Sequence, residues 1–250
     1  MLTHLFKAGF SKVIDVSLAI FIGVYMYERI NSLIGNENLD KIKNKTVLII
    51  GLGGVGSYAL ESLVRSGVNN IIIVDYDKID ITNFNRKLEA NYNTIDNYKT
   101  QVYNDRIFNI NKDVKIIGVC EKITLENYLD LFNYNFDYLI DACDDIKIKQ
   151  VLIKTCLEKN IKFISCMGTA RKLDPTKLSI TTLDKTSYDK IAKILRSYVI
   201  KEKIKGKIMV VSSTEEVINC ETTSLGSMIF VPASAGILCA KYVIDDIINQ

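Results

Sequence analysis

The chain has 250 residues, of which 48% are hydrophobic and 24% are charged, and its formal net charge is +3. This length and composition suit one large domain, or one domain with a small appendage, and exclude intrinsic disorder. The small net charge excludes a surface that coats nucleic acid throughout. Six cysteines without a CxxC pair, and a single histidine, His4, argue against zinc sites, disulfide frameworks and histidine-dependent catalysis.

An apolar stretch, Val16 to Tyr27, lies near the amino terminus. It is shorter than the ~20 apolar residues of a transmembrane helix, and its backward extension meets Asp15. No small-residue cleavage site of a signal peptide precedes Glu28. We therefore treat residues 1–27 as an apolar N-terminal extension with three open interpretations: a helix packed on the body or on a dimer partner, a membrane-surface or organelle-targeting segment, and a membrane anchor.

A glycine-rich motif, Gly-Leu-Gly-Gly-Val-Gly, occupies residues 51–56 directly after a β-branched apolar run. With the Ala/Leu/Val-spaced stretch that follows, it predicts a strand, a tight turn and a helix whose first amides face a phosphate group. Asp75 stands 19 residues after the last glycine, at the end of a second apolar run, where a carboxylate binds a ribose hydroxyl. The candidate nucleotide-binding residues of this motif are Gly51, Gly53, Gly54, Gly56 and Asp75.

Beyond Asp75 helical and strand patterns alternate, which predicts a mainly parallel sheet with right-handed crossovers. Helices are expected at 94–111, 125–132, 146–159, 187–204 and 232–248, and strands at 114–119, 138–141, 162–166 and 207–211. A turn at Pro175 precedes an antiparallel edge strand at 178–183. The expected fold class is α/β: a Rossmann-like, doubly wound, mainly parallel sheet with an antiparallel C-terminal extension.

Polar side chains follow the second predicted strand, where the carboxyl ends of the strands open into a crevice. Asp77, Asn83, Asn85 and Arg86 lie in this segment. Amide and guanidinium groups are the types that bind phosphoryl oxygens. These residues are therefore candidates for the same nucleotide site.

Two further segments supply charges at this edge of the predicted sheet. Lys99, on the next helix, provides a mobile positive charge, and Asp141 and Asp144 end the fourth strand and suit a Mg²⁺ ion that phosphates also bind. Each residue alone has an ordinary interpretation as a solvated charge or a helix N-cap. Together with the glycine motif they indicate a triphosphate site.

A basic segment extends from Arg171 to Lys207, where eleven Lys and Arg residues face four acidic residues, an excess of +7. Such an excess suits a phosphate-bearing partner. The other interpretation, a solvated charged face of a helix, stays open.

The chain resembles the adenylating core shared by ubiquitin-activating enzymes, ThiF and MoeB in five motifs: Gly51-Leu-Gly-Gly-Val-Gly56, Asp75-Tyr-Asp77, Thr82-Asn-Phe-Asn-Arg86, Lys99 and Asp141-Ala-Cys-Asp144. It is similar to the branch of tRNA threonylcarbamoyladenosine dehydratases (TcdA/CsdL-like) in segments 29–35, 167–176 and 184–186, and at Ala192 and Arg196. The resemblance begins at Tyr27. It implies that residues 28–250 form a single ATP-binding adenylating domain, with a nucleotide-binding half at 45–168 and a substrate half at 169–250.

The chemistry that the resemblance implies uses ATP and Mg²⁺. The carboxylate of the threonylcarbamoyl group on adenosine 37 of tRNA attacks the α-phosphate, and ring closure then expels AMP. Arg86, Lys99 and a Mg²⁺ ion on Asp144 act by positioning and electrostatics. No general base is required for adenylation, because a carboxylate is already ionised at neutral pH.

The resemblance also implies partners. Candidate tRNA contacts are Arg171, Lys172, Lys185 and Arg196. Relatives of this core are homodimers, so the apolar segment 228–248 is expected to contribute to a dimer interface. A sulfur-carrier or cysteine desulfurase partner is a further expectation, and cytoplasm is the expected location.

Two other classes of function stay open. One is a MoeB/ThiF-type enzyme that activates the C-terminal carboxylate of a ubiquitin-like or sulfur-carrier protein; the other is a nicotinamide-dependent oxidoreductase or a dinucleotide-sensing module. The basic segment favours RNA, and an oxidoreductase leaves Arg86 and Lys99 unexplained. A transfer cysteine is not indicated, since Cys166 and Cys220 have no activating neighbours in the sequence. One departure from the superfamily is Lys87, which follows Arg86 where Gln is usual.

Overall fold

The computed structural model describes residues 26–219 and 226–250. It divides the chain into two compact units, residues 1–41 and 42–250. Helix α2 (Glu28–Lys43) contains this division and is kinked at Gly35. The division differs from the boundary at residue 27 that the sequence suggested, and residues 45–168 and 169–250 belong to one unit.

Most of the predicted N-terminal apolar extension, residues 1–25, lies outside the described residues. In the described ranges of the chain, no helix combines the length and apolarity that crossing a membrane requires.

The second unit contains a seven-stranded sheet with the order β3-β2-β1-β4-β5-β7-β6. Six strands are parallel: β1 (Thr46–Ile50), β2 (Asn70–Val74), β3 (Lys115–Val119), β4 (Tyr138–Asp141), β5 (Lys162–Cys166) and β7 (Met209–Ser213). The edge strand β6 (Leu178–Thr182) is antiparallel to β7. The predicted fold class, including its antiparallel extension, is confirmed.

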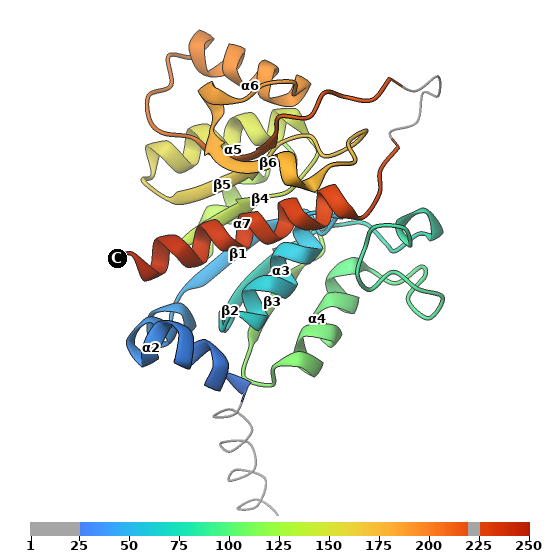
Figure 1. Ribbon diagram of the computed structural model, residues 1–250, viewed down its shortest axis with the longest axis vertical. Coiled ribbons are helices and arrows are strands. Elements are labelled where there is room, and N and C mark those ends of the chain that lie inside the picture. The colour runs from blue at the N-terminus through green and yellow to red at the C-terminus, as the bar shows by residue number, and fades with distance from the viewer. Residues whose placement is uncertain (1–25, 220–225) are drawn as a thin grey trace, which may run out of the picture. The chain divides into compact units, whose positions relative to one another are not determined.

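Helices cover both faces of this sheet. Leu48 of β1 and Leu139 of β4 belong to the core cluster that also contains Leu152 of α5 (Ile146–Glu158) and Leu195 of α6 (Lys190–Lys201). Because side chains alternate along a strand, Val47 and its neighbours on the other face point the opposite way and are equally buried. There α3 (Gly56–Arg65) and α7 (Phe230–Ile248) lie side by side (Figure 1), and α4 (Lys99–Ile110) packs on α3 and β3.

Several predicted boundaries differ from the structure by one or two residues, as for the strand predicted at 207–211, which is β7, and three predicted helices differ by more. α4 begins at Lys99 instead of residue 94, because Asp96 has a left-handed φ of 64° and Tyr98 forms a β-bridge with Lys78. The helix predicted at 125–132 is a 3₁₀ helix, η2 (Tyr128–Asn133). α6 is shorter than residues 187–204, since the side chain of Asp189 accepts a hydrogen bond from the backbone of Ala192 and starts the helix there.

Candidate functional site

The glycine turn follows β1 and lies beside the end of β4. The chain continues from β1 toward β2 on one side of the sheet and from β4 toward β5 on the other side. Gly51 has a φ of 87°, and a Cβ atom there would lie 2.8 Å from the carbonyl oxygen of Ala142. A Cβ at Gly56 would lie 1.8 Å from the carbonyl oxygen of Gly51. The turn therefore requires both glycines, and it occupies the topological switch point at which doubly wound folds bind ligands.

The amino end of α3 follows the turn directly. No side chain caps this end of the helix; the Ser57 amide donates to the carbonyl oxygen of Gly53 (3.1 Å), and the other first amides are left for an anion. A Cβ at Gly53 would meet no atom within 4 Å, whereas one at Gly54 would lie 3.5 Å from Cγ of Arg86. The turn is thus open at Gly53 and is in contact with Arg86 at Gly54.

Asp75 links the turn to the segment that follows β2. Its Oδ2 accepts a hydrogen bond from the backbone of Leu52 (2.7 Å), and its Oδ1 accepts one from the backbone of Asp77 (2.8 Å). Nζ of Lys99 lies 3.0 Å from both oxygens of Asp75 and 2.5 Å from Oδ2 of Asp77. The three residues form one ionic cluster, in which Asp75 and Lys99 are buried and Asp77 is exposed.

Lys99 is 2% exposed, so the expectation of a mobile charge at this position is wrong. Burial disfavours the charged form, but the carboxylates of Asp75 and Asp77 outweigh it and raise the pKa of Lys99. The ammonium is a fixed positive charge beside the glycine turn.

Hydrogen bonds within the loop position the polar residues that precede α4. The Asn83 carboxamide closes the 3₁₀ turn η1 (Ile81–Asn83). Asn85 Nδ2 donates to the carbonyl oxygen of Ser227 at 2.8 Å. Nη1 of Arg86 donates to the carbonyl oxygen of Thr82 (2.7 Å) and to Oδ1 of Asn85 (2.9 Å). These contacts hold the Arg86 side chain against the turn and use only one of its guanidinium nitrogens among the described residues.

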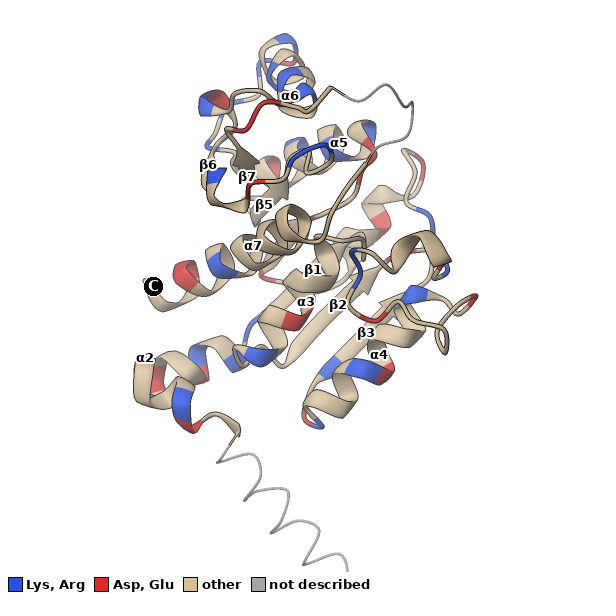
Figure 2. Cartoon of the chain, turned by 45° about the vertical axis from the view of Figure 1, so that its right-hand side comes forward, with Lys and Arg blue, Asp and Glu red and all other residues tan. Residues whose placement is uncertain are grey.

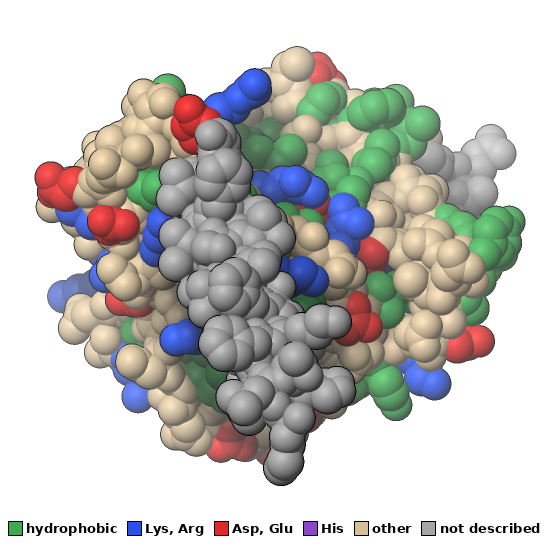
Figure 3. Space-filling model, turned by 90° about the horizontal axis from the view of Figure 1, so that it is seen from below, with side chains coloured by type: hydrophobic (Ala, Val, Ile, Leu, Met, Phe, Trp, Pro, Cys, Tyr) green, Lys and Arg blue, Asp and Glu red, His purple; other side chains and the backbone are tan. Residues whose placement is uncertain are grey.

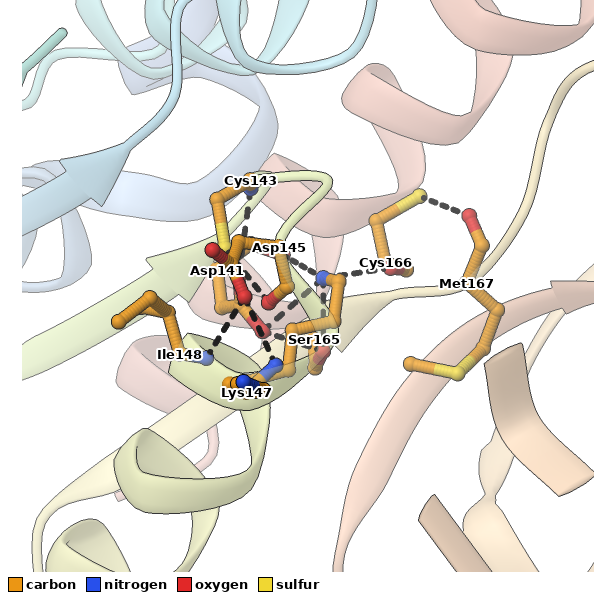
Figure 4. Close-up of polar contacts among 9 residues, drawn as sticks. Asp141, Cys143, Asp145, Lys147, Ile148, Ser165, Cys166 and Met167 are labelled. Atoms are coloured by element: carbon orange, nitrogen blue, oxygen red, sulfur yellow. Dashed lines mark hydrogen bonds and ion pairs between the residues drawn. The ribbon is translucent and has the colours of Figure 1, made fainter. Parts of the chain in front are cut away.

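Asp141 is used inside the protein. Its Oδ2 accepts hydrogen bonds from Nζ of Lys149 (3.0 Å) and Oγ of Ser165 (2.6 Å), as Figure 4 shows for the serine. Lys149 also donates to the carbonyl oxygen of Cys166 at 2.9 Å. Although burial opposes its charge, the Asp141 carboxylate raises the pKa of Lys149. Asp141 therefore braces the ends of β4, β5 and α5, and this differs from the predicted direct contact with the nucleotide.

Asp144 lies three residues farther along and is exposed, with no hydrogen bond or ion pair to the described residues. The N-cap of α5 is Asp145, whose carboxylate accepts from the backbone of Lys147 at 2.8 Å. No group of three potential metal ligands occurs in the described parts of the chain. Asp144 could therefore supply one oxygen ligand to a cation such as Mg²⁺, and other groups would have to supply the remaining ligands.

The predicted tRNA contacts differ in accessibility. Lys172 is 2% exposed and donates to the carbonyl oxygen of Ser213 (3.2 Å), and burial lowers its pKa. This placement contradicts a role in surface contact. Arg196 is half-buried and donates to the hydroxyl and carbonyl oxygens of Thr186, Arg171 is also half-buried, and Lys185 is exposed.

Apart from the exposed Cys120, the cysteines in the described residues are buried or half-buried. Cys166 is buried, and burial together with the Asp141 carboxylate raises the pKa of Cys143 well above its ordinary value. Cys220 lies outside the described residues.

Two buried charged residues next to the site were not among the predicted site residues. Lys87 is 8% exposed and donates to Oδ1 of Asn83, and burial followed by repulsion from Lys99 lowers its pKa to about 7. Glu89 is 4% exposed, neither of its carboxylate oxygens has a hydrogen-bond partner in the described structure, and burial raises its pKa to about 8. The only sequence signal was Lys87 itself, an unexpected residue within a known motif.

The chain is similar to known proteins over most of its length. The profile of the ThiF family matches residues 27–240. The tRNA threonylcarbamoyladenosine dehydratase of Bacillus subtilis (strain 168) is 39% identical over 244 residues, which cover 91% of this chain and 96% of that protein. The crystal structure of E. coli tRNA N6-threonylcarbamoyladenosine dehydratase, TcdA, in complex with AMP matches with a TM-score of 0.85 and 27% identity, over 90% of this chain and 95% of that one. The complex of the same E. coli enzyme with ATP matches with a TM-score of 0.85 and 28% identity, with the same coverage.

Proposed function

Because the chain belongs to the ThiF family, we propose that it is an enzyme that uses ATP to dehydrate threonylcarbamoyladenosine 37 of tRNA. The observation that carries this proposal is the 39% identity to the Bacillus subtilis dehydratase over almost the full length of both proteins. The glycine turn at the switch point and the cations around it supply the site for ATP.

In the first step, the carboxylate of the threonylcarbamoyl group attacks the α-phosphate of ATP, and pyrophosphate leaves. Two anions must approach each other, so the protein's task is to neutralise and align charge. Arg86 and the amides at the amino end of α3 stabilise phosphoryl oxygens, and Lys99 places a fixed positive charge beside them. Asp144 suits Mg²⁺, and the ion, bound together with phosphate oxygens, would neutralise further charge.

In the second step, a nitrogen or oxygen of the same modification attacks the acyl carbon, closes a ring and expels AMP. Both reacting groups belong to one substituent, so the step is intramolecular and needs no transfer cysteine.

The surface around the start of α6 is our candidate for tRNA docking. Asp189 Oδ2 accepts a hydrogen bond from the backbone of Gly168 (2.8 Å), which follows β5, so α6 begins at the same edge of the sheet as the glycine turn. Lys190 and Lys193 are exposed there, and Tyr188, which precedes them in the chain, is 57% exposed. Cations together with an exposed aromatic ring suit phosphates and a stacked base.

The distribution of charge supports this choice. Several Lys and Arg residues lie on α6 and in the segments that flank it (Figure 2). On the uncovered part of the face in Figure 3, basic and acidic side chains are instead interspersed with apolar ones. The proposed tRNA-docking surface therefore contains Lys190 and Lys193 and keeps the exposed Lys185, whereas the buried Lys172 is removed from it.

Two properties of the whole protein belong to the same proposal. Met228, Phe230 and Ile237, at and near the start of α7, are about half exposed, so we propose that this apolar surface contributes to a homodimer. Cytoplasm, where tRNA and ATP are both present, is the proposed location. Membrane contact by the N-terminal residues and a sulfur-carrier partner are not needed for the reaction.

The test is nucleoside mass spectrometry of tRNA that carries threonylcarbamoyladenosine, after incubation with the purified protein, ATP and Mg²⁺. We expect the modified nucleoside to lose one water while AMP and pyrophosphate form. Unchanged tRNA, with ATP bound, would instead favour the alternative function, activation of the C-terminal carboxylate of a ubiquitin-like or sulfur-carrier protein.

A further inference from the structure

Lys87 is a buried lysine without a carboxylate partner. It follows Arg86 directly, and its Nζ donates to a neutral acceptor, Oδ1 of Asn83. The carboxylates of Asp75 and Asp77 are bonded to Lys99 instead. A buried ammonium normally pairs with a carboxylate, so the lack of one among the described residues marks Lys87 as unusual.

The charges that face Lys87 come from three segments. Arg86 lies beside it in sequence, Lys99 reaches it from α4, and Asp75 reaches it from the end of β2. Lys87 in turn acts on the carboxylates of Asp80 and Glu89 in its own loop. Within this group Lys99 and Arg86 repel a proton on Lys87, while Asp75 attracts it.

The position of Lys87 is next to the phosphate-binding turn. Backbone and side-chain atoms of Arg86 lie 3.5 Å from the position of a Cβ at Gly54. Lys87 is thus the residue after Arg86, which contacts the glycine turn, and it lies close enough to Lys99 to be repelled by its charge. Three cationic side chains converge where ATP would bring several negative charges.

The ionisation of Lys87 responds to such an anion. Burial, and then the positive charge of Lys99, lower the pKa of Lys87 to about 7, so a large fraction of the side chain is neutral at physiological pH. A polyanion nearby favours the charged form and reverses this effect.

Building on the proposed function, we propose that Lys87 binds the triphosphate of ATP and takes up one proton from solvent as it does so. The neutral amine becomes an ammonium, which donates hydrogen bonds to phosphoryl oxygens. The residue is then a proton-coupled contact for ATP, in addition to Arg86 and the amides of α3.

The experiment is isothermal titration of the full-length protein with ATP at pH ~8, in HEPES and in Tris, whose different ionisation enthalpies reveal the number of protons taken up. At this pH the terminal phosphate of free ATP is largely deprotonated, and a lysine with a pKa about 7 is about 90% neutral. We expect the wild-type protein to take up as much as about 0.9 proton per ATP. Lys87→Gln should bind ATP more weakly and take up close to none.

The matched control is Lys112→Gln, a change of an exposed lysine beyond the far end of α4, which should titrate like the wild type. The proposal is overturned if the wild-type protein binds ATP without proton uptake, or if Lys87→Gln takes up as many protons as the wild type. The second result would assign the proton to another group, such as Glu89. A wild-type protein that binds no ATP at all would contradict the proposed function, which is a separate outcome.

Discussion

Lys99 and Arg86 are both cations beside the glycine turn, but the protein holds them in different ways. Lys99 is buried between Asp75 and Asp77, whereas Arg86 is partly exposed and bonded only to neutral oxygens. Removal of Lys99 therefore leaves a buried carboxylate without its counter-charge, while removal of Arg86 does not. The removal of either residue therefore has a different effect on stability, although the proposed function gives both residues similar roles.

Arg86→Ala is expected to reduce ATP–pyrophosphate exchange by about 100-fold or more, because a positive charge aimed at phosphoryl oxygens is lost. Its thermal midpoint should change little. Lys99→Ala should reduce exchange as well and, in addition, lower the free energy of unfolding by about 3 kcal/mol. Exchange assays paired with thermal denaturation check both. Normal exchange in Arg86→Ala would remove this residue from the mechanism.

Glu89 should make stability depend on pH. Its pKa is raised from 4.5 to about 8, so between these values the folded protein retains a proton that the unfolded chain releases. Stability therefore falls as the pH rises through this window, and the penalty is complete above pH ~8. Glu89→Gln should raise the melting temperature by a few degrees at pH ~9 and by little at pH ~5. A gain of equal size at both pH values would show that the carboxyl group does not titrate as described.

Among the site residues, the sequence located those whose roles depend on short spacings. The glycine turn, Asp75 and Arg86 were predictable because a strand, a turn and a helix follow one another within a few residues. The pairing of Asp141 with Lys149 and Ser165 was not predictable, because it joins three elements that only the folded sheet brings together. The burial of Lys172 escaped prediction for the same reason.

At the scale of elements, the contact between α3 and α7 determines where the amides at the start of α3 lie, which we propose bind phosphate. A Cβ at Gly236 of α7 would lie 2.2 Å from the carbonyl oxygen of Val55, the N-cap of α3. A helix with any larger residue here must move away from the start of α3. The predicted mainly parallel sheet with its antiparallel edge strand was confirmed, while this close approach of two helices far apart in sequence carries no periodic signal.

Gly236→Ala is accordingly expected to lower the free energy of unfolding by about 2 kcal/mol and to weaken ATP binding, because α3 and the glycine turn must shift. Thermal denaturation and an ATP titration measure the two effects. Gly118→Ala in β3 serves as the control, since the new Cβ would lie 3.4 Å from its nearest neighbour, an ordinary contact. Unchanged ATP affinity in Gly236→Ala would show that the turn does not depend on the packing of α7.

For the whole molecule, a net charge of only +3 conceals an uneven distribution. The excess of +7 between Arg171 and Lys207 is compensated elsewhere in the chain, so a field that attracts RNA is confined to one region. Composition alone could predict this excess, but only the fold shows that the start of α6 lies at the same edge of the sheet as the glycine turn.

Lys190→Gln combined with Lys193→Gln should weaken tRNA binding and reduce the dependence of log affinity on log salt by about 2 units, roughly one for each lost phosphate contact. ATP binding should not change. The control is Lys112→Gln with Lys159→Gln, which removes the same charge from the carboxyl ends of α4 and α5. Equal salt slopes for both double variants would exclude α6 as the docking surface.

The carboxylate of Asp75 already has four donors: the backbone amides of Leu52 and Asp77 and two contacts from Lys99. A carboxylate offers about four lone-pair positions, so a ribose hydroxyl can bind Asp75 only by replacing one of these donors. The amides are fixed in the backbone, which leaves Lys99 as the exchangeable one. Sugar and ammonium thus compete for the same oxygens, and a bound nucleoside would take one contact of Lys99 while the others to Asp75 and Asp77 still hold the ammonium in place.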